Sequence, residues 1–253
     1  MSGFWAVFKR ELLAFFVTPL AWVLILVFLA IQGLHFYILV DQFSSAPDAA
    51  MGDQSPVSAF FGNTAILYFI LFLLVPPLTM RSFAEERRSG TIETLLTAPL
   101  GTTGIVLAKF AAALVTYMAL WLPTALYLVI LQRSGAIDWN VAFTSYLGVL
   151  LVGAGYLSIG LLASSLTSSQ FIALISTALV LMLLFLVGLG EFGAKDGSLR
   201  QAIASYVSVW AQMNDFASGV IDSRRLVFDG TLIVVPLFLT VKVLDGLRYG
   251  GAS

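Results

Sequence analysis

The chain has 253 residues, of which 59% are hydrophobic and only 11% are charged. Ordinary soluble domains are about 45–50% apolar and about 25% charged, so this composition predicts a membrane protein rather than a soluble enzyme. The formal net charge of −1 offers no basic field for nucleic acid, and the absence of cysteine excludes disulfides and thiolate metal sites.

Four long stretches, 12–40, 54–80, 110–132 and 139–190, contain no charged residue. A bilayer core of ~30 Å needs ~20 apolar residues as helix, so the first three stretches each hold one span and the fourth holds two. The first stretch is too long for a signal peptide and is interpreted as a retained span. The runs are solid rather than alternating, which favours helices over a β-barrel.

The predicted fold is therefore a single all-α transmembrane domain over residues 1–253. A hinge between the fourth and fifth spans is expected in the Ser- and Thr-rich segment 164–170, and Asp229 and Lys242 interrupt the last run. The six expected spans lie at about 20–40, 57–80, 103–131, 142–164, 171–189 and 226–244.

The distribution of Lys and Arg predicts the orientation, because these residues favour the cytoplasmic side in short loops. With the N-terminus inside, eight of the 13 Lys and Arg residues fall in the cytoplasm and five fall outside. The loop after the first span carries Asp41, Asp48 and Asp53 but no Lys or Arg. Both termini and residues 82–108 are thus predicted to be cytoplasmic, and residues 42–56 and 189–224 to be external.

The segment 4–17 precedes the first span and has helical periodicity. At about 100° per residue, its aromatic side chains and a leucine share one arc, and its charged residues lie outside that arc. This pattern predicts an amphipathic helix in the membrane interface; the alternative is a simple extension of the first span, which Pro19 would begin. The residues assigned to the interfacial helix are Phe4, Trp5, Phe8, Lys9, Arg10 and Leu12.

Two further segments have recognisable patterns. The stretch 190–222 is too polar to span, but apolar residues recur in it at helical spacing, so one or two short external helices are expected. The fourth span is rich in small residues, which allow helix backbones to approach closely in lipid. Packing within one subunit is favoured over a dimer seam for these residues, which are Gly148, Gly153, Gly155, Ser158, Gly160 and Ser164.

The spans lack the chemistry of an enzyme or an ion-coupled carrier, which usually place ionisable groups inside the membrane. The only histidine is His35, and a packed or interfacial role is the expected one for it. No Gly is followed by Lys, so the chain has no phosphate-binding loop of the G-x-x-x-x-G-K type. Any energy for transport must therefore come from another polypeptide.

One patch, residues 81–100, departs from this pattern because five of its first eight residues are charged. The charged residues are expected where the second span leaves the membrane, and Ser89-Gly90 is expected to break its helix. A short amphipathic helix is expected next, at about 91–98. Gly90 would be its N-cap with Glu93 near the third position, and Pro99 would end it. Ile92, Leu95 and Leu96 share one face, which needs a cover: lipid, the rest of the protein, or a partner.

The patch, "FAEERRSGTIETLLTAPL", resembles the cytoplasmic loop of type-2 ABC transporter permeases, and within them the small permeases of gliding machinery and nitrous-oxide-reductase maturation. The C-terminal "FASGVIDSRRLVFDGTLIVVPLFLTVKVLDGLR" resembles the last external helix and sixth span of the same subgroup. One departure is Asn214-Asp215-Phe216, where the subgroup often has a His-Phe pair.

The resemblance implies a permease subunit in a bacterial cytoplasmic (inner) membrane. Two permease copies, identical or paralogous, would assemble with two P-loop ATPase subunits that hold the Mg-ATP; this chain would hold no cofactor. The helix at 91–98 would be the coupling helix and the one at 4–17 the connecting helix. The residues assigned to ATPase coupling are Glu85, Glu86, Arg87, Arg88, Gly90, Thr91, Ile92, Glu93, Leu95 and Leu96.

Two other functions remain open from the sequence. The chain could be a non-transporting scaffold that anchors a cytoplasmic machine, or a membrane-embedded enzyme acting on lipid. The missing acid–base residues argue against the enzyme. The charge run 85–88 could form ion pairs with a partner or within the chain, or could simply be solvated, in which case exposed pairs contribute only ~0–1 kcal/mol.

Overall fold

The computed structural model describes residues 3–45, 55–62, 65–97, 100–134, 137–193 and 199–250. Within them the fold is all helical, and six helical segments are long and apolar enough to cross a membrane, as predicted. The segments are Pro19–Ser45, Ala65–Arg88, Thr102–Arg133, Trp139–Leu166, Gln170–Gly193 and Ser223–Arg248.

The chain order of the helices is simple. The first half contains α1 (Gly3–Val17), α2 (Pro19–Ser45), α3 (Pro56–Phe61), α4 (Ala65–Thr79), α5 (Ala84–Arg88), α6 (Ile92–Thr97) and α7 (Thr102–Trp121). The second half contains the 3-10 turn η1 (Leu122–Thr124), α8 (Ala125–Ser134), α9 (Trp139–Leu166), α10 (Gln170–Gly193), α11 (Leu199–Val207), α12 (Val209–Ala217) and α13 (Ser223–Gly250).

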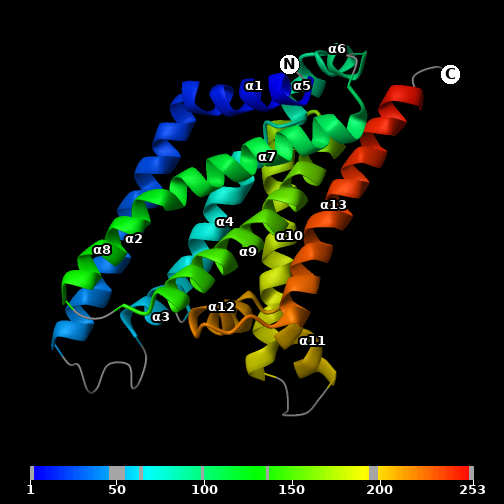
Figure 1. The fold of residues 1–253 in the computed structure, drawn as a ribbon. Helices are drawn as coiled ribbons and strands as arrows, with labels where there is room; N and C mark the ends of the chain where they lie inside the picture. The colour runs from blue at the N-terminus through cyan, green and yellow to red at the C-terminus, as the bar shows by residue number, and fades with distance from the viewer. Residues whose placement is uncertain are drawn as a thin grey trace.

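Helix α1 lies across one end of the bundle, and the chain then turns sharply into α2 (Figure 1). The turn is at Thr18, whose hydroxyl donates to the Phe15 carbonyl at 2.8 Å, and Pro19 begins α2 as predicted. The Trp22 indole also donates to the Phe16 carbonyl at 3.0 Å, which holds the corner. Segment 4–17 is therefore a separate helix and does not simply extend the first span.

The second predicted span, 57–80, is wrong at its start. Residues Pro56–Phe61 form the separate short helix α3, which begins at a Ser55 cap whose side chain accepts from the Ser58 amide. The spanning helix itself begins at Ala65. The absence of charged residues from 54–80 hid this boundary, although the letters Gly62-Asn63-Thr64 are a local turn signal in the sequence.

The third and fifth spans also differ in detail from the prediction. Pro123 lies in the 3-10 turn η1, which divides the third span into α7 and α8 without ending it. Helix α10 continues to Gly193 and takes in the start of the predicted external segment. The hinge before α10 falls at 167–169, inside the predicted segment.

Helix α9 forms the centre of the molecule, with its glycines facing neighbouring helices. A Cβ on Gly153 would lie 2.3 Å from the Tyr117 ring, and one on Gly148 would lie 2.6 Å from the Phe216 ring. Gly160 faces Thr79 in the same way. The small residues of the fourth span therefore pack within one subunit, as expected from the sequence.

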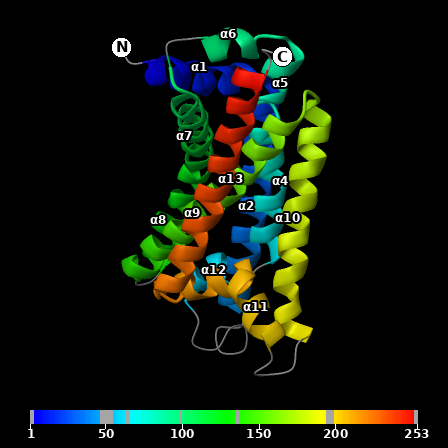
Figure 2. The ribbon, with the colours of Figure 1, turned by 90° about the vertical axis from the view of Figure 1, so that its right-hand side faces the viewer.

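The bundle has two distinct ends (Figure 2). Both chain ends, α1, α5 and α6 lie at one, here called the α6 end, whereas α3, α11 and α12 lie at the other, the α12 end.

At the α12 end, Gln212 donates to the buried carboxylate of Asp229 at 2.5 Å, which joins α12 to α13. His35 is buried too and stacks on Phe60 with ring centroids 4.8 Å apart, the packed role expected for it.

Candidate functional site

Helix α6 has one buried and one exposed face. Leu95 and Leu96 are buried in an apolar cluster, and Ile92 packs against its edge. The cluster consists of Phe83, Leu95, Leu96, Ile105, Val106, Leu161, Leu237 and Leu244. Of the three covers considered for these leucines, lipid, the rest of the protein or a partner, the structure shows the second: the chain's own core covers them.

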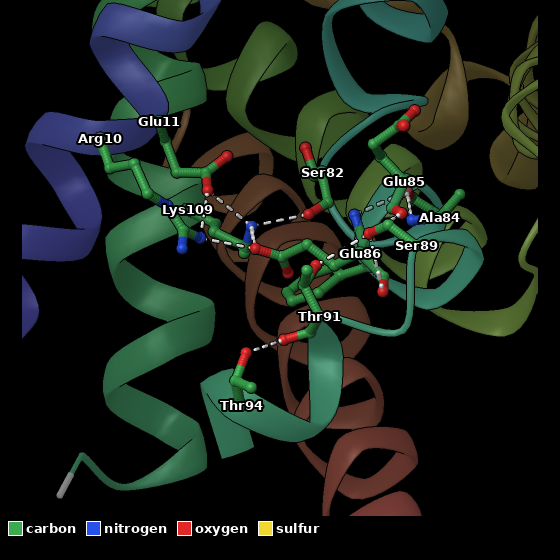
Figure 3. Close-up of polar contacts among 12 residues, drawn as sticks. Arg10, Glu11, Ser82, Ala84, Glu85, Glu86, Ser89, Thr91, Thr94 and Lys109 are labelled. Atoms are coloured by element: carbon green, nitrogen blue, oxygen red, sulfur yellow. Dashed lines mark hydrogen bonds and ion pairs between the residues drawn. The ribbon is translucent and has the colours of Figure 1, made fainter. Parts of the chain in front are cut away.

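The opposite face of α6 is free for contact. Glu93, Thr94 and Thr97 are exposed, as is Thr91 just before the helix. Short hydrogen bonds keep this face in order, since the Thr94 hydroxyl donates to the Thr91 carbonyl at 2.7 Å (Figure 3). The surface that α6 offers outward is therefore polar and small.

Gly90 has a different local role from the predicted one. Its φ is +74°, a backbone conformation that costs a non-glycine residue roughly 1–2 kcal/mol. It follows the C-cap of α5 at Ser89, and α6 begins at Ile92, so Gly90 is the left-handed residue that ends α5 rather than the N-cap of α6. This conformation reverses the chain so that α6 lies over the end of the bundle.

The end of α9 fixes the turn that leads into α5. The Ser164 hydroxyl accepts from the amides of Phe83 and Ala84 at 3.0 and 3.1 Å and donates to the Met80 carbonyl at 3.1 Å. The Arg87 guanidinium donates to the Ser165 carbonyl at 2.5 Å. Arg87 is therefore held within the chain, which makes it a structural residue of α5.

An ion cluster centred on the buried Lys109 joins α1, α5 and α7 (Figure 3). The Lys109 ammonium lies 2.8 Å from Glu11 Oε1 and 3.0 Å from Glu86 Oε1, and donates to the Ser82 carbonyl at 2.7 Å. Arg10 reaches the same two carboxylates, at 2.9 Å from Glu11 and 2.5 Å from Glu86. The Lys109 side chain is only 1% exposed, and from α7 it contacts carboxylates of both α1 and α5.

Arg10 is held in its charged form within this cluster. Burial by itself lowers the pKa of the Arg10 guanidinium, but the Glu11 and Glu86 carboxylates outweigh that effect and hold the pKa above its ordinary value. Glu85 and Arg88 are different, because they form only a loose pair at 3.7 Å with side chains 42% and 67% exposed. In the charge run 85–88, Glu86 and Arg87 are therefore held by other parts of the chain, whereas Glu85 and Arg88 are solvated.

Sequence reasoning placed the coupling residues together but missed Lys109 and Glu11. Glu11 and Lys109 are 98 positions apart in the chain, and no periodicity joins them. The available signal was the isolated position of Lys109 at the head of the apolar run 110–132. In α1, Phe4 and Trp5 both stack on Phe8, while Leu12 is half-buried and Lys9 is exposed.

Comparison with known families places most of the chain within one family model. The family model described as "ABC-2 family transporter protein" matches residues 5–211, which include most of α1, the Lys109 ion cluster and α6. A comparison with curated proteins gives no match.

Proposed function

Because this chain belongs to the family of ABC-2 transporter proteins and is a membrane-spanning permease, we propose that it couples to a separate P-loop ATPase. Hydrolysis of Mg-ATP on that partner drives export or mechanotransmission across a bacterial cytoplasmic membrane. Two permease copies and two ATPase subunits form the working unit. We also propose that the chain belongs to the subgroup of permeases for gliding machinery and nitrous-oxide-reductase maturation.

The observation that carries this proposal is the construction of α6. Its apolar face is fixed to the core through Leu95 and Leu96, and its polar face is exposed at the end of the bundle. A rigid element with an exposed face can receive a push from a partner and pass it to the helices beneath. Glu93, Thr94 and Thr97 supply the contact surface, and the buried leucines transmit the force.

The experiment measures binding of a P-loop ATPase encoded beside this chain to the purified full-length permease. Thr97→Arg places a bulky charge on the exposed face of α6 and is expected to weaken binding at least about tenfold, or ~1.4 kcal/mol. Ser218→Arg, an equally exposed site at the α12 end, is the matched control and should bind normally. Equal binding by both variants at normal yield would show that α6 is not the coupling element.

A second arm separates docking from folding. Leu95→Asp/Leu96→Asp should lower the thermal stability of the isolated permease, because burying each leucine contributes ~1.5–3 kcal/mol. Thr97→Arg should leave that stability unchanged. The isolated chain is expected to show no ATP hydrolysis, and substrate-dependent stimulation of the bound ATPase in vesicles distinguishes a transporter from a scaffold.

A further inference from the structure

A large cavity with a mixed lining lies beside the ion cluster at the α6 end. Its volume is about 840 Å³, and its walls come from α1, α2, α4, α5, α7, the start of α10 and the segment 81–94. The charged lining residues are Arg10, Glu11, Arg81, Glu85, Glu86, Arg88 and Lys109. Four cations therefore face three carboxylates, which leaves a formal surplus of one positive charge.

That surplus lies on Arg81. Glu11 and Glu86 are both held by Lys109 and Arg10, and Glu85 faces Arg88 at 3.7 Å. Arg81 is exposed and has no hydrogen bond or ion pair within the described part of the chain. Its guanidinium is thus a planar set of donors available to an acceptor that enters the cavity.

The opposite part of the cavity is apolar. Its lining there consists of Ala14, Phe15, Leu20, Pro77 and Leu78. Leu20 and Leu78 belong to the candidate membrane spans Pro19–Ser45 and Ala65–Arg88, whereas Arg81 and the α6 residue Thr94 lie at their polar end. The cavity therefore crosses the level at which the membrane's apolar core gives way to its headgroups.

We propose that this cavity binds a membrane phospholipid, with the phosphate of its headgroup on Arg81 and the start of its acyl chains against Phe15, Leu20 and Leu78. Phosphate matches the fork of a guanidinium through two parallel hydrogen bonds. The apolar wall gives the site a reason to prefer a lipid to free phosphate. This inference concerns the isolated chain and does not depend on an ATPase partner.

The test titrates dihexanoyl phosphatidylglycerol into the detergent-purified full chain by calorimetry. Arg81→Gln should weaken saturable binding about tenfold, equivalent to ~1.4 kcal/mol. Lys9→Gln is the matched control, since Lys9 is an exposed cation at the same end of the molecule that does not line the cavity. It should bind within about twofold of the wild type, because pocket binding, unlike general attraction to cations, is insensitive to it.

A second variant guards against a folding defect. Ala14→Trp fills the cavity without changing any charge and should also weaken binding at unchanged thermal stability. Dihexanoylglycerol, which lacks the phosphate, and inorganic phosphate should both bind more weakly than the phospholipid. Equal losses in Arg81→Gln and Lys9→Gln, or equal binding of either partial ligand, would overturn the proposal. Loss of ATPase binding with lipid binding intact would count against the proposed coupling role alone.

Discussion

At the scale of single residues, Lys109 is the buried charge at the centre of the ion cluster. Its ammonium contacts one carboxylate oxygen each of Glu11 and Glu86, and the Ser82 carbonyl, from a position almost closed to water. Burying such a pair brings little net stability over an apolar replacement of the whole cluster, but removing one partner strands the charges that remain. The same cation lies 5.1 Å from the centroid of the Phe83 ring, so it also contacts the apolar cluster beneath α6.

The variant Lys109→Met should therefore be strongly destabilising. Breaking a buried pair costs about 3–5 kcal/mol, and for a chain of this size that predicts a fall in Tm of about 6 °C or more. The measurement is thermal unfolding in detergent. Lys242→Met is the control, because Lys242 is exposed and its charge lies only over the Phe238 ring. Equal Tm values for both variants would contradict the structural role of the cluster.

Gly90 gives a second test at the residue scale. With φ at +74° and no atom near a new Cβ, Gly90→Ala meets backbone strain alone, of roughly 1–2 kcal/mol. Gly246→Ala, inside α13, has equally open surroundings and a helical backbone, so it should be neutral or slightly stabilising. Chemical denaturation of the two variants measures the difference, and an unchanged midpoint for Gly90→Ala would show that the turn adopts another conformation.

At the scale of elements, α9 is the helix on which the others pack. It contacts α13, α10, α12 and α4, and its side chains are the most buried of any span among the described residues. Small residues are needed there because the neighbouring helices approach its backbone directly. Two hydroxyls strengthen this packing, as Ser158 donates to the Leu232 carbonyl and Thr144 to the Phe216 carbonyl, each at 2.7 Å.

One methyl group on α9 is accordingly expected to be costly. Gly153→Ala would place Cβ against the rigid Tyr117 ring, whose hydroxyl is also bonded to the Val149 carbonyl at 3.1 Å. Overpacking of this kind costs typically ~1–3 kcal/mol. Gly230→Ala on α13, where the same Cβ meets nothing within 4 Å, should be neutral or slightly stabilising. The measurement is the Tm of the two variants. An unchanged Tm for both would mean that α7 and α9 can move apart without loss of stability.

At the scale of the whole molecule, the arrangement of the ends bears on orientation. Both chain ends, α1 and α6 share one end of the bundle, and α11 and α12 occupy the other. Which end is cytoplasmic follows only from the bias of Lys and Arg, and it remains a prediction.

Single-cysteine labelling tests that orientation directly, since the chain has no native cysteine. Ser218→Cys, at the α12 end, should react with an impermeant maleimide added to intact cells. Ser89→Cys, at the α6 end, should react only after the cells are permeabilised. Both serines are exposed, so a reversed pattern would mean that α6 faces outward and could not meet a cytoplasmic ATPase.

The sequence predicts the spans well because a membrane imposes their length, and α1 because its aromatic residues share one arc. It predicts the burial of the α6 leucines poorly. An amphipathic face at Ile92, Leu95 and Leu96 shows that a cover is needed, but the identity of the cover depends on α7, α9 and α13. The Lys109 cluster escaped for a related reason, since its partners come from helices that only the tertiary fold brings together.

The Ser164 hydroxyl links the end of α9 to the start of α5. It lies at the last turn of a 28-residue helix, a rod of about 42 Å, and it holds the amides at the start of α5. The other half of that rod touches α12 through the contact between Gly148 and Phe216. A force on α6 would therefore act on a long, continuous helix, α9. We expect α9, rather than a series of flexible loops, to pass the resulting displacement to α12.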